Sequence, residues 1–287
     1  MDDLGPIGVF DSGVGGLSVW LEIARQLPTE STIYVADQAH VPYGSRSLSE
    51  VRAYSEAIAQ FLLARRSKMI VVACNTASAA ALHHLRRVFR EVPFVGMEPA
   101  IKPAAQHTRT GTVGVMATPA TFRGELFSSL LQRYGEHVKV LTQVSPGLVE
   151  AVERGELDTP ETEALLRRSL APLLNAGIDQ LALGCTHYPF LRPLIERVAG
   201  PRVTVIDPAP AVARQVARVL AQAGLSRNGA SQAQHAFYST GQLEPFAQMM
   251  RRLVATEAAH AELRGASWQG DSLAEAPLGA PQSDHDP

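Results

Sequence analysis

Short apolar runs alternate with amphipathic stretches along most of the chain, and this alternation limits the possible folds more than any other feature. The runs are apolar throughout, which is typical of strands buried on both faces of a parallel sheet. The stretches between them place apolar residues three or four positions apart, which predicts helices that cover the sheet. The expected strands are residues 6–13, 31–37, 68–76 and 92–97, and the expected helices are residues 16–27, 49–66 and 77–90.

The pattern restarts near residue 112, where "TVGVMATPATFRGELFSSLLQRYG" resembles the opening strand, turn and helix. In the sequence, 63 residues separate Asp11 from Cys74, and 68 separate Ala117 from Cys185. Each half therefore runs from a strand with a small polar turn to a later strand that ends in Cys and Thr. We expect an α/β fold of two similar doubly wound domains with mostly parallel sheets, and an active site in the cleft between them.

Composition limits the classes of function. The 287 residues are 46% apolar, enough for a sizeable core, and the net charge of −2 with no dense basic run gives nucleic-acid binding little electrostatic support. No stretch approaches the roughly 20 apolar residues of a membrane-spanning helix. The acidic N-terminus runs straight into a strand and does not resemble a signal peptide. We expect a cytoplasmic protein with no membrane partner.

The two cysteines occupy matched positions, each at the end of an expected strand and each followed within two residues by threonine. A single free cysteine is usually a small apolar packing residue. Two of them at strand-to-loop junctions, where open α/β sheets bind ligands, favour chemistry instead. A zinc site is a poor fit because "CTH" supplies only Cys185 and His187, and the sequence has no CxxC redox motif. We therefore expect free thiols and no metal.

A glycine-rich turn, "DSGVGG", invites a dinucleotide-binding interpretation, with Asp37 near the position of a ribose-binding acid. The third glycine of that fingerprint is replaced by Ser18, and Asp11 in the turn would repel a pyrophosphate. A smaller anion such as a carboxylate fits such a turn equally well. Asp11 and Asp37 can also be read as capping residues, and Glu153 as a solvated helical acid. Acids near two thiols suit proton transfer more than acyl transfer.

Five segments together resemble the glutamate racemases of the aspartate/glutamate racemase superfamily: "VFDSGVGGLSV", "YVADQAHVPYGSRS", "VVACNTASA", "GVMATPAT" and "LALGCTHYPFL". The resemblance implies cofactor-independent interconversion of L- and D-glutamate, which supplies D-glutamate for peptidoglycan. It also implies a first domain of residues 1–97 plus 207–264 and a second domain of residues 98–206. Residues 265–287 are rich in Gly, Pro, Ser and Asp, and we expect a disordered tail there.

The same resemblance assigns roles to individual residues. Cys74 and Cys185 are the two acid/base residues, the first acting on D-glutamate and the second on L-glutamate. Asp11, Asp37, Glu153 and His187 assist them, although Glu150 lies one helical turn from Glu153. The residues implied in substrate binding are Asp11, Ser12, Tyr43, Gly44, Asn75, Thr76, Thr118, Thr121, Thr186 and His187.

Other interpretations stay open at this point. The chain is alternatively a superfamily member acting on a different acidic substrate, or a decarboxylase in which one thiol works. A secondary gyrase-binding role, reported for some relatives, has no visible surface in the sequence. We expect a homodimer that binds a small-molecule substrate. If both sulfurs approach one carbon at about 3–3.5 Å, they lie roughly 7 Å apart, too far for a disulfide.

Overall fold

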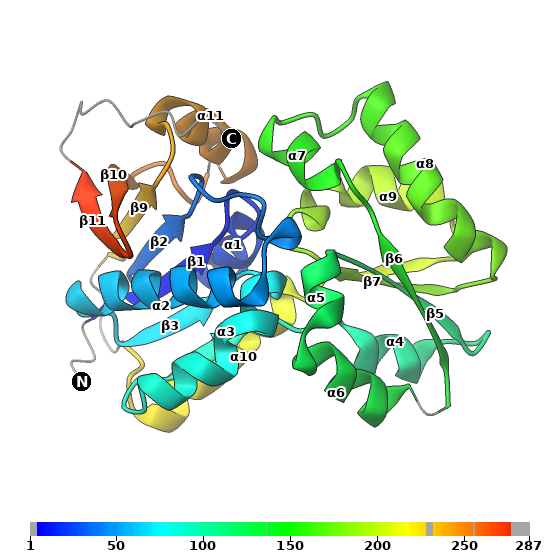
Figure 1. Cartoon of the computed structure of the whole chain (residues 1–287), viewed down its shortest axis with the longest axis horizontal. Coiled ribbons are helices and arrows are strands. Elements are labelled where there is room, and N and C mark those ends of the chain that lie inside the picture. Colours follow the sequence, from blue (N-terminus) through cyan, green and yellow to red (C-terminus); the bar gives the residue numbers. More distant parts are fainter. Residues whose placement is uncertain (1–4, 136, 228–231, 255, 277–287) are drawn as a thin grey trace.

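The computed structural model describes residues 5–135, 137–227, 232–254 and 256–276, which form two α/β units side by side, each built on its own sheet (Figure 1). Seven strands of the described chain form the first sheet, in the order β11-β10-β9-β2-β1-β3-β4. Neighbouring strands are parallel except for the antiparallel pair β10–β11. The strands are β1 (Ile7–Asp11), β2 (Thr32–Ala36), β3 (Met69–Val72), β4 (Phe94–Gly96), β9 (His235–Ser239), β10 (Glu262–Gln269) and β11 (Ser272–Ala276).

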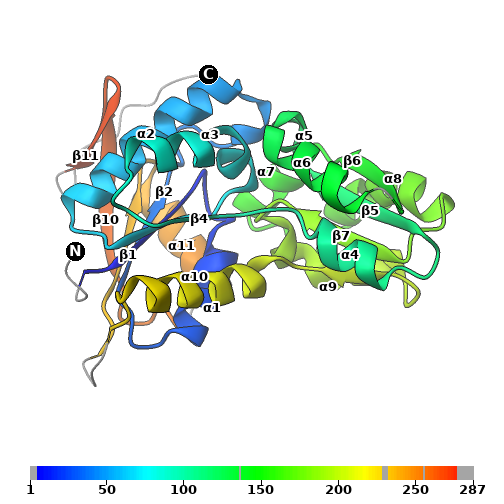
Figure 2. The ribbon, with the colours of Figure 1, turned by 90° about the horizontal axis from the view of Figure 1, so that it is seen from below.

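Helices cover both faces of the first sheet (Figure 2). Side chains alternate between the two faces along each strand, so β1 contributes to two separate cores. Ile7 and Val9 pack in the cluster that contains Trp20, whereas Phe10 packs in the cluster that contains Ile58. The first face carries α1 (Leu17–Gln26), α10 (Ala209–Ala223) and α11 (Leu243–Val254), and the second carries α2 (Leu48–Ala64) and α3 (Asn75–Val88).

The second sheet has four parallel strands among the described residues, in the order β6-β5-β7-β8. They are β5 (Thr112–Ala117), β6 (Lys139–Val144), β7 (Gln180–Gly184) and β8 (Thr204–Ile206). Ile101, Phe127 and Leu130 cover one face, and Leu166 and Leu170 belong to the core on the other. The helices of this unit are α4 (Ile101–His107), α5 (Pro119–Arg123), α6 (Glu125–Tyr134), α7 (Leu148–Glu153), α8 (Pro160–Asn175) and α9 (Arg192–Ala199).

The chain passes from the first sheet to the second after β4 and returns after β8, where α10 packs against α1. The prediction of a two-unit α/β fold with mostly parallel sheets is confirmed.

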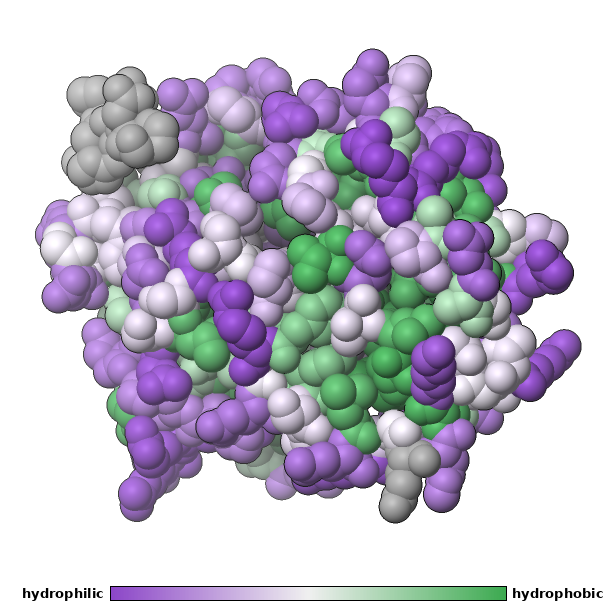
Figure 3. Space-filling model, turned by 45° about the vertical axis from the view of Figure 1, so that its right-hand side comes forward, coloured by the Kyte–Doolittle hydropathy of each residue, from purple (hydrophilic) through white to green (hydrophobic). Residues whose placement is uncertain are grey.

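Within the described residues, no helix has the length and apolar character needed to cross a membrane. In the view of Figure 3 the second unit is turned toward the reader. Apolar residues gather on this face, and hydrophilic residues surround them.

The prediction of a disordered segment from residue 265 is wrong for residues 265–276. Strand β10 pairs in parallel with β9, and β11 folds back onto β10 as a hairpin. Ala266 is fully buried, and Trp268 and Leu273 pack against the core that contains Phe10 and Val35. Composition misled the prediction because a few apolar residues at alternate positions suffice for a strand on an existing sheet edge. Residues 277–287 lie outside the described part.

Ending the chain after Arg264 is therefore expected to destabilise the first unit. The truncation removes part of β10 and all of β11, and it exposes the apolar surface that Trp268 and Leu273 cover. The free energy of unfolding is expected to fall by about 3 kcal/mol or more, which is comparable with the effect of truncating one large core side chain. Thermal unfolding followed by circular dichroism checks this, and an unchanged midpoint would show that the hairpin contributes nothing to stability.

Candidate active site

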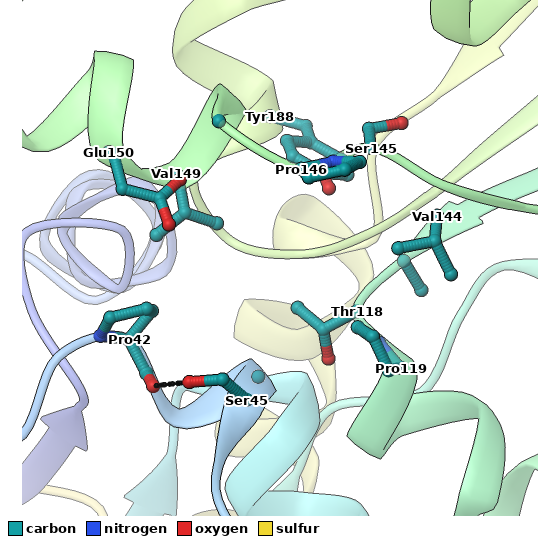
Figure 4. A pocket seen from close by; sticks show the side chains of 13 residues that line it. Pro42, Ser45, Thr118, Pro119, Val144, Ser145, Pro146, Val149, Glu150 and Tyr188 are labelled. Atoms are coloured by element: carbon teal, nitrogen blue, oxygen red, sulfur yellow. Dashed lines mark hydrogen bonds between the residues drawn. The ribbon is translucent and has the colours of Figure 1, made fainter.

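The carboxyl ends of strands from both sheets meet around one small cavity. Its lining includes both cysteines, and its volume of about 20 Å³ is close to the space of a single water molecule. A wider cavity of about 160 Å³ shares Pro42, Gly44, Thr118 and Val149 with it and forms its mouth (Figure 4). The lining residues of the inner cavity are Ser12, Pro42, Tyr43, Gly44, Cys74, Asn75, Thr76, Thr118, Val149, Cys185, Thr186 and His187.

Cys74 follows β3 and caps the N-terminus of α3. Its backbone is extended, and its Sγ accepts a hydrogen bond from the Ala77 amide at 3.4 Å. Burial raises the pKa of this thiol well above its ordinary value, and the charge of Asp11 adds to the shift, while the Ala77 amide opposes it. The Cys74 thiol is therefore protonated at rest and ready to donate a proton.

Cys185 follows β7 and has a cationic partner instead. Its Sγ lies 3.7 Å from His187 Nδ1, and His187 Nε2 lies 2.6 Å from Glu153 Oε1. Burial opposes protonation of His187, but its hydrogen bonds to Cys185 and Glu153 and their charges outweigh burial and raise its pKa well above the ordinary value. An imidazolium at His187 puts a positive charge beside the Cys185 sulfur, whereas the Cys74 sulfur faces the carboxylate of Asp11, so the two thiols have opposite electrostatic surroundings.

Glu153, rather than its neighbour Glu150, belongs to this group. Its carboxylate also accepts hydrogen bonds from the Val14 amide at 2.9 Å and from Gln38 Nε2 at 2.8 Å. Burial disfavours its charge, but these bonds and the bond to His187 prevail and lower its pKa below the ordinary value. Glu150 lines the mouth instead. Val14 and Gln38 carry no signal in the sequence, because only the fold brings them to a residue more than a hundred positions away.

The glycines of "DSGVGG" make room for these groups. A Cβ on Gly13 would overlap Glu153 Oε1, and one on Gly15 would overlap His187 Nδ1. A Cβ on Gly16 would come within 2.6 Å of Asp11 Cβ. Gly13 and Gly15 therefore leave room for side chains of the second unit, and Gly16 leaves room for Asp11 of its own unit. Close packing therefore accounts for glycine at these positions, without any role in dinucleotide binding.

Asp11 lies behind the cavity and connects the two units. It is fully buried; its Oδ1 accepts from the Ser12 amide at 2.5 Å, and its Oδ2 accepts from Thr186 Oγ1 at 2.9 Å. Burial raises its pKa, although the charge of His187 and the hydrogen bonds from Thr186 and Ser12 offset part of the rise. A cationic group placed in the cavity would favour the charged carboxylate.

One buried polar side chain in the cavity wall, that of Asn75, points to a polar ligand. Asn75 is 3% exposed, and neither its Oδ1 nor its Nδ2 has a hydrogen-bond partner among the described residues. Three buried hydroxyls lie nearby: Thr76 Oγ1 is 2.8 Å from Thr118 Oγ1 and 3.3 Å from Thr121 Oγ1. A buried amide next to Cys74 with both atoms unsatisfied is costly unless a ligand engages it.

Asp37 does not line the cavity. Its buried carboxylate accepts from Tyr43 Oη at 2.6 Å, and His40 Nδ1 lies 2.9 Å from the same oxygen, Oδ2. The other oxygen accepts from Thr240 Oγ1 at 2.9 Å and from Trp268 Nε1 at 2.8 Å. The structure thus places Asp37 behind Tyr43, in contact with a wall of the site rather than with its interior.

Replacing Glu153 by Gln is expected to lower activity at neutral pH by about 10- to 100-fold, because hydrogen bonds to a charged group are lost. The raised pKa of His187 keeps the imidazolium protonated as the pH rises, and the variant loses a main cause of that shift. The basic limb of the kcat/KM profile is therefore expected to move to lower pH. E150Q is the matched control, one helical turn away, and its profile is expected to keep its shape. An unchanged pH profile in E153Q would show that Glu153 does not hold His187 in its charged form.

Comparison with known proteins shows to which family the chain belongs. The family model for Asp/Glu/hydantoin racemases matches residues 7–216. The glutamate racemase of Roseiflexus sp. (strain RS-1) is 53% identical over 249 residues, covering 86% of this chain and 92% of that protein. The crystal structure of glutamate racemase isoform RacE1 from Bacillus anthracis superposes with a TM-score of 0.82 at 33% identity, covering 93% of this chain and 98% of that one.

A second solved structure has a bound amino acid. Glutamate racemase from Escherichia coli, in complex with L-glutamate and the activator UDP-MurNAc-ala, matches with a TM-score of 0.81 at 31% identity, covering 93% of this chain and 100% of that one. The matched family region contains both cysteines and the glycine turn. These matches confirm the resemblance on which the site assignments rest. The chain belongs to the Asp/Glu/hydantoin racemase family and, within it, to the glutamate racemases.

Proposed function

We propose that the protein interconverts L- and D-glutamate by proton transfer between two thiols, without a cofactor or metal. The observation that carries the proposal is that Cys74 and Cys185, on different sheets, open onto the same cavity with opposite electrostatic surroundings. A racemase must remove the α-proton from one face and return a proton to the other. One thiolate and one thiol on facing units are suited to that task.

For L-glutamate, the Cys185 thiolate takes the α-proton, and the electron pair of the C–H bond is delocalised into the α-carboxylate. The Cys74 thiol then gives its proton to the opposite face of the carbon. The product is D-glutamate, and the two sulfurs have exchanged protonation states. His187 stabilises the Cys185 thiolate, and Glu153 holds His187 in its charged form. The D-to-L reaction uses the same steps in reverse.

Substrate recognition is proposed for the polar groups of the cavity. The unsatisfied amide of Asn75 and the hydroxyls of Ser12, Thr76 and Thr118 supply donors for carboxylates, as does the backbone at the start of α3. Asp11 supplies negative charge for the substrate ammonium group. Thr121 supports Thr76 and Thr118 through its hydroxyl. Tyr43, Gly44 and Thr186 complete the wall.

The inner cavity is too small for glutamate, so substrate entry requires the units to separate at the mouth. We propose that residues 5–97 with 207–276 move as one domain and residues 98–206 as the other. We also propose that the protein is cytoplasmic, since its two free site thiols favour a reducing compartment. By its likeness to the glutamate racemases, we propose that it is a homodimer and that it supplies D-glutamate for peptidoglycan. Size-exclusion chromatography with light scattering tests the dimer.

Circular dichroism of L-glutamate solutions tests the activity directly. Protein dialysed against a chelator, without added cofactor, is expected to abolish the optical signal with time, starting from either enantiomer. L-aspartate serves as the control substrate and is expected to keep its signal. A stable L-glutamate signal would reject the proposed function, and recovery of activity on adding a metal would reject its cofactor independence.

A further inference from the structure

The C-terminal hairpin reaches the substrate site through one side chain. Trp268 on β10 donates a hydrogen bond from its indole Nε1 to Asp37 Oδ1 at 2.8 Å, across 231 positions of sequence. Its ring packs edge-on against His40 and Tyr54, with centroids 5.0 and 5.4 Å away. Trp268 is therefore fixed both by packing and by a directional bond to a buried carboxylate.

Asp37 passes this constraint to the site. Each of its oxygens faces two groups, so the carboxylate has little freedom to turn. Tyr43 is one of the four partners, and burial together with the charge of Asp37 holds the Tyr43 pKa well above its ordinary value. The phenol stays protonated and donates to Asp37. The position of the Tyr43 ring thus depends on the position of Asp37.

Tyr43 and Gly44 form a wall of the inner cavity, and Pro42 and Gly44 also line the mouth. This segment touches the second unit closely, since a Cβ on Gly44 would come within 2.8 Å of Thr118 Cβ. A shift of Tyr43 would change the space between the two units. The chain of contacts therefore runs from the hairpin through Asp37 and Tyr43 to the wall where substrate binds.

We propose that Trp268 is a positioning residue, which holds Asp37 and thereby sets Tyr43 and Gly44 in place to bind substrate. The proposal rests on the proposed function. It makes the β10–β11 hairpin part of the substrate site, although no atom of the hairpin lines the cavity. Trp268 touches no reacting atom, so its effect is expected in binding rather than in chemistry.

The test uses W268F, which keeps an aromatic ring but lacks the indole N–H. The KM for L- and D-glutamate is expected to rise about three- to tenfold, with kcat within about twofold of the wild type, because the hydrogen bond that holds Asp37 behind the Tyr43 wall is lost. L273A is the matched control. Leu273 lies opposite Trp268 in the hairpin register and packs against the same core, but its side chain has no group that can donate a hydrogen bond to Asp37. Its KM is expected to stay at the wild-type value even where its thermal midpoint falls.

A double-mutant cycle with Y43F tests the route. If Trp268 acts through Asp37 and Tyr43, adding W268F to Y43F is expected to change KM by less than about 1.5-fold. Independent, multiplicative effects would overturn the proposal, as would an unchanged KM in W268F or an equal rise in L273A. A wild-type protein that does not racemise glutamate would reject the proposed function instead. The two failures are therefore distinguishable.

Discussion

Replacing either Cys74 or Cys185 by serine is expected to lower racemisation of both enantiomers by about 10³-fold or more, at the high end of what a positioned acid or base contributes. In the proposed mechanism each thiol is the base in one direction and the acid in the other, so neither direction survives the loss of one sulfur. Serine keeps the size of the side chain but is a far weaker acid than a thiol. Circular dichroism of both enantiomers measures the loss, and the thermal midpoints serve as the control for folding.

The two variants are expected to differ when only one proton transfer is needed. With N-hydroxyglutamate, removal of the α-proton expels hydroxide from nitrogen and forms an imine, which water converts to a keto acid and ammonia. C74S retains Cys185 and is expected to eliminate from the L-isomer. C185S retains Cys74 and is expected to eliminate from the D-isomer. Elimination from the same isomer in both variants would show that one cysteine is only a packing residue.

Replacing His187 by Gln is expected to lower kcat/KM by about 10²- to 10⁴-fold, because the thiolate that the proposed mechanism places at Cys185 would lose its cationic neighbour. The reduction must be equal for L- and D-glutamate, since the two enantiomers have the same free energy in solution. Elimination from N-hydroxyglutamate is free of that constraint. There the L-isomer, deprotonated by Cys185, is expected to lose far more rate than the D-isomer. An equal loss for both isomers would show that His187 does not act through Cys185.

The pKa shifts of His187 and Glu153 also predict how this pair changes the stability of the protein with pH. His187 has a raised pKa, so its contribution is fully present below its ordinary value and is lost as the pH rises through the folded-state value. Glu153 has a lowered pKa, so its contribution is present above its ordinary value and is lost as the pH falls through the folded-state value. The pair therefore stabilises the protein most at intermediate pH.

The features that were predictable from sequence depend on short stretches of chain. A buried parallel strand that ends in Cys and Thr is recognisable by itself, and the carboxyl ends of such strands meet by topology. Strand β6 was missed because its side chains are half-exposed, as expected at a sheet edge, and lack the continuous apolar character of its neighbours. The choice between Glu150 and Glu153 needed the fold, because both lie on the short helix α7.

Contacts between segments that are far apart in the chain could not be predicted from the sequence. Gln38 and Val14 hold Glu153, and Trp268 holds Asp37, each across more than a hundred positions. The glycines of "DSGVGG" suggested an anion-binding turn, whereas their lack of side chains admits Glu153 and His187 from the second unit. The polar composition of the hairpin segment concealed Ala266 and Trp268, which the edge of a preformed sheet can bury.

Racemisation in D₂O tests the two-thiol account most directly. Both thiols exchange with solvent, so the acid that reprotonates the carbon delivers deuterium, while the base carries away the original proton. Early in the reaction from L-glutamate, the D-glutamate formed is expected to be fully deuterated at Cα, and the remaining L-glutamate is expected to keep its proton. Proton NMR of the separated enantiomers measures both. D-glutamate that retains the original α-proton would show that a single base serves both faces, which would contradict the assignment of Cys74 and Cys185 as opposed acid and base.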